Sequence, residues 1–351
     1  MTDDRIAWLK ERKAGIGGSD VAAVLGINPY RTPLDVYLDK TNPNVEDKPI
    51  SDSAYWGTLL EDQVANEFSR RTGMKVQRVN QSLQQNFMNK LTHMQGWTNL
   101  PTNWARANID RAVINPDLAK TVRIAKPGSK FESKGLVLTT DTILECKTAS
   151  LRMSTEWGPS QEEEIVAGNV ESEHEIPMYY ETQVQWYMAI TGAKTAYVAV
   201  LIGGQDFRIY KVDRDEDLIQ TIIERCADFW LNHVLAGVPP EATSAADVRK
   251  LYQKDDGELE EATNEQAADI GELRNLRAQI KELQDQEKAV ASKVIAAIGP
   301  HLGLTIGGKK AVTYKHQVTR RLASSELKEA NPEIYNAFLK ESETRVLRLA
   351  A

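Results

Sequence analysis

An apolar run that ends in Glu-x-Lys places the strongest constraint on the fold. Residues 143–144 are Ile and Leu, and they lead directly into Glu145, Cys146 and Lys147. We expect a strand that takes in residues 136–138 and continues through this run. Because successive side chains of a strand point to opposite faces, Glu145 and Lys147 should project to the same side. The sequence therefore predicts a carboxylate and an ammonium group held side by side.

A second carboxylate, Asp110, closes another apolar stretch, residues 107–109. If a strand over 107–109 pairs with the strand that carries Glu145, the two carboxylates meet. Oxygen ligands of this kind suit Mg²⁺ or Mn²⁺, which can polarise a phosphoryl oxygen and lower the pKa of a bound water. Lys147 would orient or deprotonate that water. The pattern indicates phosphodiester cleavage, and the alternative is a solvated surface pair, the commoner setting for Glu-x-Lys in a strand.

Two helices are expected to contribute to the same site. Residues 177–190 begin with proline and are soon followed by glycine, which is typical of a helix start and a helix end. Gln183 and Tyr187 are four residues apart on this segment, so they share one face from which both could reach a phosphate. Apolar spacing predicts another helix over residues 54–72, which carries Glu61.

A glycine-rich turn lies near the start of the chain. Residues 15–20 follow Arg12 and lead into a helical run over residues 21–25. Such a turn can offer backbone N–H groups and the positive end of a helix dipole to an anion. The alternative, which the local sequence favours, is an ordinary helix start capped by Ser19.

Several blocks of the chain come in a recognisable order: Arg12, Gly17-Gly18-Ser19, Trp56-Gly57, Glu61, Asp110, Glu145-Cys146-Lys147 and Gln183-Val184-Gln185-Trp186-Tyr187. In this order the chain resembles the YqaJ-like viral recombinases, relatives of the phage lambda exonuclease within the PD-(D/E)xK nuclease superfamily, over roughly residues 5–235. The resemblance implies an α/β fold in which a mixed central sheet is flanked by helices.

The resemblance also implies roles for individual residues. It assigns catalysis to Glu61, Asp110, Glu145, Lys147, Gln183 and Tyr187, the 5′ phosphate of duplex DNA to Arg12 and Ser19, and the metal to Asp110, Glu145 and the backbone carbonyl of Cys146. The thiol of Cys146 would be incidental.

The activity implied is Mg²⁺-dependent 5′-to-3′ exonuclease action on linear double-stranded DNA, with Mn²⁺ able to substitute, leaving 3′ single-stranded tails for phage-type recombination. The expected partners are double-stranded DNA ends and a single-strand annealing protein, with a homo-oligomer as an option and no membrane. A phage or prophage gene expressed in the bacterial cytoplasm fits this activity. Two alternatives stay open: a structure-specific endonuclease on the same core, and a binding module for a recombination partner.

Cysteine content and hydropathy agree with a cytoplasmic enzyme. Cys146 and Cys226 lie in apolar segments, as reduced thiols do. A chain with 2 cysteines cannot build a four-cysteine iron–sulfur cluster from its own residues. Apolar stretches fall far short of the ~20 residues of a membrane span, and the acidic N-terminus is unlike a secretion signal.

The net charge of −7 is unusual for a DNA-binding enzyme, but phosphate contacts depend on local charge. One basic segment, residues 117–134, contains Lys120, Arg123, Lys126, Lys130 and Lys134. A second basic run lies within residues 309–321. Either could follow a DNA backbone. For the first segment, a solvated hairpin whose lysines protect its edge is an equal alternative.

The 351 residues, 41% of them hydrophobic, suffice for one large core and a smaller unit. We expect a nuclease domain over 1–240, an acidic linker over 241–262 and a C-terminal helix–hairpin–helix appendage over 263–351. Within the appendage, a 3-4 apolar spacing predicts a long helix over 272–298. A hairpin over 304–314 and a helical region over 324–340, broken at Pro332, should follow. The long helix could pack on the nuclease, or pair with another subunit or a partner.

Overall fold

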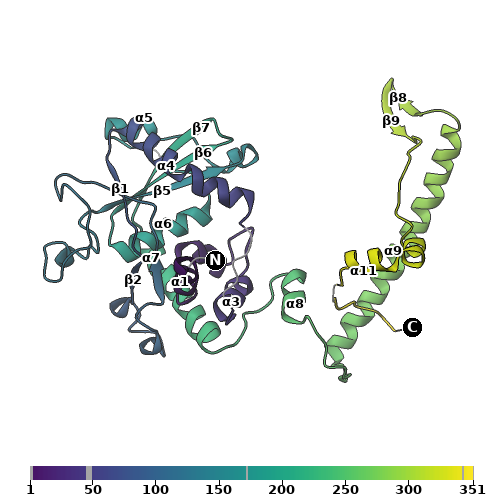
Figure 1. Ribbon diagram of the computed structural model, residues 1–351, viewed down its shortest axis with the longest axis horizontal. Helices are drawn as coiled ribbons and strands as arrows, with labels where there is room; N and C mark the ends of the chain where they lie inside the picture. Colours follow the sequence, from purple (N-terminus) through teal and green to yellow (C-terminus); the bar gives the residue numbers. More distant parts are fainter. Residues whose placement is uncertain (1–2, 45–49, 171–172, 342–343, 351) are drawn as a thin grey trace. The chain divides into compact units, whose positions relative to one another are not determined.

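The computed structural model describes residues 3–44, 50–170, 173–341 and 344–350. The chain divides into two units, Met1–Val248 and Arg249–Ala351 (Figure 1). Within the described ranges, the structure contains no helix that is long and apolar enough to cross a membrane.

The first unit contains most of the secondary structure. Its helices are α1 (Asp3–Lys13), α2 (Gly18–Val24), α3 (Pro33–Thr41), α4 (Asp52–Thr72), α5 (Glu162–Ala167), α6 (Met178–Thr191), α7 (Glu216–Phe229) and, reaching the unit boundary, α8 (Ala245–Leu251). Its strands are β1 (Val76–Arg78), β2 (Leu83–Gln85), β3 (Ala105–Ala107), β4 (Arg111–Val113), β5 (Thr142–Ala149), β6 (Thr195–Ile202) and β7 (Asp206–Asp213). Short helical turns are η1 (Met88–Lys90), η2 (Trp97–Asn99), η3 (Glu132–Lys134), η4 (Leu151–Glu156) and η5 (Trp230–Leu235).

Five of these strands form one sheet in the order β1-β4-β5-β6-β7. The pairing of β5 with β6 is parallel, and the other three pairings are antiparallel. A separate two-stranded sheet joins β2 to β3. Helices cover the large sheet on both faces (Figure 1). The predicted fold class, a mixed central sheet flanked by helices, is confirmed.

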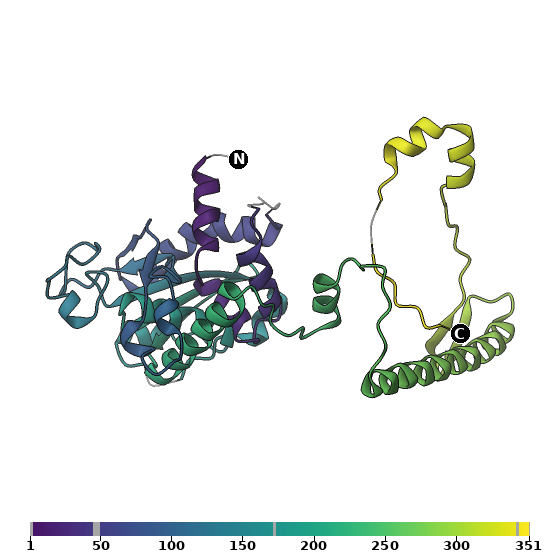
Figure 2. The same ribbon diagram turned by 90° about the horizontal axis from the view of Figure 1, so that it is seen from below.

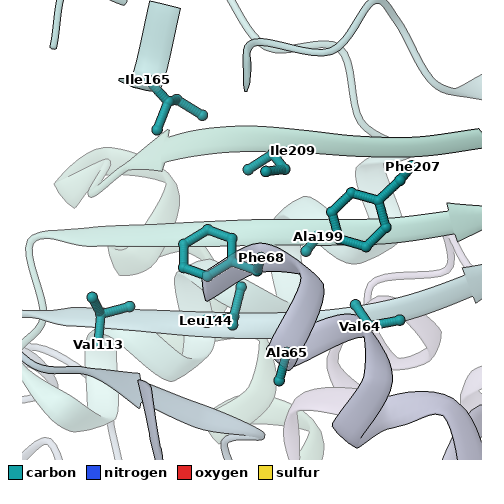
Figure 3. Packing of buried hydrophobic residues seen from close by; sticks show 9 residues of the cluster. All are labelled: Val64, Ala65, Phe68, Val113, Leu144, Ile165, Ala199, Phe207 and Ile209. Carbon is teal, nitrogen blue, oxygen red and sulfur yellow. The ribbon is translucent and has the colours of Figure 1, made fainter. Parts of the chain in front are cut away.

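Helix α4 covers one face of the large sheet. Its apolar residues Val64, Ala65 and Phe68 are buried against five side chains of the sheet, namely Val113, Leu144, Ala199, Phe207 and Ile209 (Figure 3). The helix ends at Gly73, which adopts the left-handed conformation with φ 72°, a geometry that glycine accepts without steric cost.

Helix α6 lies on the opposite face. Leu144 of β5 packs with α4, whereas the next residue, Glu145, hydrogen-bonds to Gln183 of α6. This is the alternation that a strand imposes. α6 is anchored by the indole of Trp186, which is fully buried and donates a hydrogen bond to the carbonyl of Arg106 at 2.9 Å.

Two expected strands are corrected by the structure. Residues 136–138 are not part of β5, which begins at Thr142; Leu138 forms an isolated bridge with Ile124 instead. Residues 107–109 do not form the strand that pairs with β5. The chain bends there, so that β3 ends at Ala107, and β4, which starts directly after Asp110, pairs with β5. Asp110 therefore precedes its strand and does not end one.

The expected helices near the site are confirmed, with small changes at their ends. The helix expected over 177–190 is α6, which starts one residue later, and the helix expected over 54–72 is α4, which starts two residues earlier. The basic segment 117–134 has little regular structure apart from η3, and its five Lys and Arg side chains are exposed.

The second unit contains α9 (Asn264–Ile298), β8 (Gly303–Ile306), β9 (Lys309–Thr313), α10 (Ser324–Ala330) and α11 (Pro332–Phe338). Figure 2 shows α9 as one uninterrupted helix. It is longer than the 272–298 expected, because Thr263 and Gln266 form a capping box at its start. The expected hairpin and the break at Pro332 are both present. Along α9, apolar side chains such as Ile280 and Leu283 are exposed.

Candidate active site

The start of β4 brings Asp110 next to the Glu-x-Lys sequence in the middle of β5. Arg111, the first residue of β4, pairs with Leu144 of β5. The residue before it, Asp110, therefore lies beside the point where β5 runs past β4. There its Oδ2 accepts a hydrogen bond of 2.8 Å from the backbone N–H of Cys146.

Glu145 and Lys147 lie on one face of β5 and are in direct contact. Glu145 is 3% exposed, and its Oε1 accepts hydrogen bonds from Lys147 Nζ and Gln183 Nε2, both at 2.6 Å. Lys147 Nζ also donates to Gln183 Oε1 at 3.1 Å, and Gln183 Nε2 donates to the hydroxyl of Tyr187 at 3.0 Å. The structure thus joins β5 to α6 through a continuous polar network.

The two carboxylates of this cluster, Asp110 and Glu145, repel each other, and a bound cation would offset that repulsion. Burial, together with the neighbouring charge of Glu145, raises the pKa of Asp110 well above its usual value. Burial lowers the pKa of Lys147, but the charges of Glu145 and Asp110 outweigh this effect and raise the pKa overall. The side chain is therefore positively charged. Within the described residues, Glu145 Oε2 is buried without a hydrogen-bond partner. A buried carboxylate oxygen that lacks a donor is costly unless a cation meets it.

These residues fit a hard divalent cation. The structure shows no group of three or more His, Cys, Asp or Glu side chains with metal-binding geometry in the parts of the chain that it describes. A metal at this point would therefore use two carboxylates and main-chain oxygen. Oxygen-only donor sets with few protein ligands suit Mg²⁺, which keeps several waters.

Cys146 can act there through its main chain but not through its thiol. Its side chain lies on the α4 face of the sheet, among the residues that pack around Phe68. Burial raises the pKa of the thiol above its usual value, so it is not a thiolate. In a strand the N–H and C=O of one residue point to the same edge. Because the N–H of Cys146 meets Asp110, its carbonyl faces the same edge, where β4 has not yet begun.

Glu61 is placed nearby, but its carboxylate is bonded to arginines. Its Oε1 accepts from Arg111 Nη1 at 2.6 Å and from Arg78 Nη2 at 3.0 Å. Its negative charge still contributes to the raised pKa of Asp110. Glu61 is therefore linked to Asp110 through Arg111, whose Nη1 also donates to the backbone carbonyl of Asp110 at 2.5 Å.

The glycine-rich turn lines a cavity of about 180 Å³ beside this cluster. Its walls include Arg12, Gly17, Ser19 and Tyr187, and Arg12 Nη2 donates to the hydroxyl of Ser19 at 3.3 Å. Ser19 is the second residue of α2, so it does not cap that helix, and the alternative of a serine-capped start is wrong. Tyr187 belongs both to the cavity wall and to the network around Glu145.

A buried ion pair fixes the shape of this cavity. Lys40 Nζ bonds to Asp20 Oδ2 at 2.7 Å and donates to the carbonyl of Arg12 at 2.8 Å. The same Asp20 oxygen accepts from the N–H of Gly17 at 3.0 Å. Burial raises the pKa of Asp20, but Lys40 and Arg31 outweigh it and hold the pKa below its usual value. The backbones at Arg12 and Gly17 are therefore tied to one buried carboxylate.

Gly18 is required because the ring of Tyr187 occupies the space of a side chain. A Cβ at Gly18 would lie 2.4 Å from Tyr187 Cε1. If the cluster cleaves phosphodiesters as the sequence predicts, Gly18→Ala is expected to lower the rate roughly tenfold or more, since displacing the ring breaks the link to Gln183, and misplacement by about 1 Å can cost a hundredfold. Initial rates on a linear duplex measure this.

Gly271→Ala is the matched control, because a Cβ there meets nothing within 4 Å. It should leave the rate unchanged and slightly stabilise α9. A Gly18→Ala protein with full activity would show that the position of Tyr187 is unimportant.

Sequence reasoning missed three charged residues near the cavity: Glu11, Lys40 and Arg106. Arg106 lies inside β3 between two buried alanines. An arginine in such an apolar strand is buried only when it is paired, and this was the available signal. Its partner could not be read from the sequence, because Glu11 is 95 residues away.

Known proteins resemble this chain in sequence and in structure. The YqaJ-like viral recombinase domain matches residues 7–194. The chain is 32% identical over 348 residues to the Bacillus subtilis protein YqaJ, which is described as uncharacterized, and the match covers 97% of this chain and 92% of that protein. Two solved structures are more distant. An alkaline exonuclease from Laribacter hongkongensis has 18% identity and a TM-score of 0.41 over 68% of this chain and 94% of its own. A phage-related exonuclease from Haemophilus somnus has 11% identity and a TM-score of 0.38 over 64% and 96%.

Proposed function

Because the chain belongs to the YqaJ-like viral recombinase family, we propose that it is a Mg²⁺-dependent exonuclease. It degrades linear double-stranded DNA from the 5′ ends and leaves 3′ single-stranded tails for recombination. An annealing protein that binds single strands would use this product. A phage or prophage gene fits the family.

One observation carries the proposal: Tyr187 lines the cavity at Arg12, and its hydroxyl is linked through Gln183 to the buried carboxylate of Glu145. A 5′ phosphate held by Arg12 and Ser19 would place the adjoining nucleotide beside Glu145 and Lys147. Cleavage would then occur near the held end, and each cut would create a new 5′ phosphate. This arrangement supports stepwise removal of nucleotides in the 5′-to-3′ direction.

The metal would be held by Asp110, Glu145 and the carbonyl of Cys146. When bound, Mg²⁺ would polarise a phosphoryl oxygen and offset the charge that develops in the displacement. Lys147, cationic beside Glu145, would orient the attacking water and the phosphate oxygens. Gln183 holds the Glu145 carboxylate and the Tyr187 hydroxyl in register, because its amide bonds to both. Mn²⁺ should replace Mg²⁺, since the ligands are all oxygen.

The basic segment 117–134 supports contact with the rest of the duplex. Its side chains Lys120, Arg123, Lys126, Lys130 and Lys134 are exposed. It lies between Asp110 and Glu145 in the sequence, within the connection from β4 to β5. Exposed lysines and arginines that release counterions from DNA supply affinity without sequence preference.

Digestion of two DNA forms tests the proposal. End-labelled linear duplex and covalently closed circular DNA are incubated with the protein, with and without Mg²⁺. We expect release of nucleotides from the linear form with Mg²⁺, persistence of the closed circle, and no release in EDTA. Cutting of the closed circle would establish an endonuclease, and label released first from the 3′ ends would reverse the proposed direction.

A further inference from the structure

A buried arginine with no role in the proposed reaction borders the cavity beside Arg12, called the Arg12 cavity below. Arg106 lines the cavity together with Glu11, Arg12 and Ser19. Its side chain is 8% exposed, which leaves more than nine-tenths buried. A buried guanidinium is costly unless it is paired, and Glu11 Oε1 accepts a hydrogen bond of 2.7 Å from Arg106 Nη1. A carboxylate thus pairs with one of the two arginines in the cavity that is proposed above to bind a phosphate.

The arginine of this pair is fixed in place. Arg106 Nε donates to the carbonyl of Asn103 at 3.0 Å. Its backbone N–H donates to the carbonyl of Ile16, and its carbonyl accepts from the indole of Trp186, both at 2.9 Å. These hydrogen bonds at the main chain and at Nε hold the guanidinium in the wall of the cavity.

The carboxylate of the pair is the movable partner. Glu11 belongs to α1, close to its end, and its side chain is 44% exposed. It can therefore exchange the contact with Arg106 for water at little cost. An exposed charge is well solvated, whereas the buried one needs a partner.

We propose that Arg106 is a second cation that binds a terminal 5′ phosphate. When no DNA end is bound, the carboxylate of Glu11 pairs with Arg106 in the position of that phosphate. This inference rests on the proposed function, because it names what the Arg12 cavity binds. A terminal phosphate monoester carries close to two negative charges at neutral pH, since its second pKa is about 6. An internal phosphodiester carries one charge, as Glu11 does. Exchange on Arg106 therefore favours a terminal phosphate, and Glu11 acts as a specificity-determining residue.

Equilibrium binding in EDTA tests the exchange without cleavage. Short duplexes with 5′-phosphate or 5′-hydroxyl ends are titrated with wild-type protein, Arg106→Gln and Glu11→Gln. Arg106→Gln should bind the 5′-phosphate duplex roughly tenfold more weakly than wild type, because charge-assisted hydrogen bonds are strong. It should bind the 5′-hydroxyl duplex as tightly as wild type does. Glu11→Gln should bind the phosphate duplex roughly threefold or more tightly, because the competing charge is removed while the amide can still accept from Arg106.

A double variant and a matched arginine sharpen the test. With Arg106→Gln already in place, Glu11→Gln should have no further effect, which is the coupling that a shared site predicts. Arg70→Gln is the control, because Arg70 is paired with Glu67 on α4 and does not line the cavity. It should leave both affinities unchanged.

The possible failures are distinguishable. Suppose wild-type protein prefers 5′-phosphate ends, Arg12→Ala abolishes that preference, and Arg106→Gln keeps it. The proposed function would then stand, and the role of Arg106 would be wrong. A wild-type protein with no preference would overturn both. Equal weakening of both duplexes by Arg106→Gln would mean that the arginine is purely structural.

Discussion

Replacing Asp110 by asparagine is expected to lower the rate of DNA cleavage by roughly a thousandfold while raising the melting temperature of the metal-free protein. Loss of a metal ligand removes several kcal/mol of transition-state stabilisation, and each ~1.4 kcal/mol is tenfold in rate. The gain in stability has a separate cause, because burial and the charge of Glu145 disfavour an ionised Asp110. Activity assays and thermal melts in EDTA measure the two effects.

The pH dependence of the gain follows from the raised pKa. The favourable contribution of a protonated Asp110 is fully present below about pH 4, the ordinary pKa of an unfolded aspartate. It is lost as the pH rises through the higher pKa of the folded state. The asparagine variant cannot ionise, so its advantage in melting temperature should be larger at pH 8 than at pH 5. Added Mg²⁺ should stabilise wild type and not the variant.

Glu67→Gln provides a control of opposite sign. Hydrogen bonds from Arg70 and Arg71 lower the pKa of Glu67 to about 2, so its charge is favoured in the folded state. This variant should melt at a lower temperature than wild type and cut DNA at the same rate. An Asp110→Asn protein that cleaves normally, or one that melts lower than wild type in EDTA, would show that the carboxylate pair is misassigned.

The parts of the site that depend on local sequence could be predicted. Alternation along β5 places Glu145 and Lys147 on one face, and the structure brings them to 2.6 Å. A spacing of four on α6 places Gln183 and Tyr187 together, and their side chains bond at 3.0 Å. These relations follow from the periods of a strand and a helix, which hold wherever the element lies.

The strand that presents Asp110 could not be predicted, for a physical reason. Ala107, Ile109, Ala112 and Val113 are all buried. When a short segment is apolar on both faces, alternation cannot fix where the strand begins or which partner it has. The bend after β3 lets Ala107 pair with β2, and it lets Arg111 pair with β5. Only contacts distant in sequence distinguish these arrangements.

The cavity could not be predicted either, because its shape depends on contacts between residues distant in sequence. The glycine-rich turn and Arg12 were visible in the sequence, but the groups that shape them were not. Lys40 reaches Arg12 across 28 residues, and Arg106 reaches Glu11 across 95. No periodicity relates such positions. The local pattern at Ser19 favoured a helix cap, whereas the fold turns that hydroxyl towards Arg12.

The second large effect on the rate of DNA digestion is expected from replacing Arg12. Wild-type protein is expected to digest duplexes with 5′-phosphate ends roughly ten to a hundred times faster than duplexes with 5′-hydroxyl ends, and Arg12→Ala should erase the difference. A guanidinium gives paired hydrogen bonds to phosphate oxygens that a hydroxyl end cannot accept in the same way. The carbonyl of Arg12 is fixed by Lys40, so its side chain starts from a defined position. Rates under single-turnover conditions measure the ratio for each protein.

Two further variants separate recognition of the end from general attraction to DNA. Arg12→Lys should restore part of the preference, since lysine keeps the charge and loses the planar fork. Lys130→Ala, in the exposed basic segment, should slow both substrates equally and flatten the dependence of binding on salt, because a backbone contact releases counterions from either end. If wild type digests both duplexes at the same rate, the Arg12 cavity does not read a terminal phosphate. The endonuclease alternative would then account better for the carboxylate cluster, because it needs no free end.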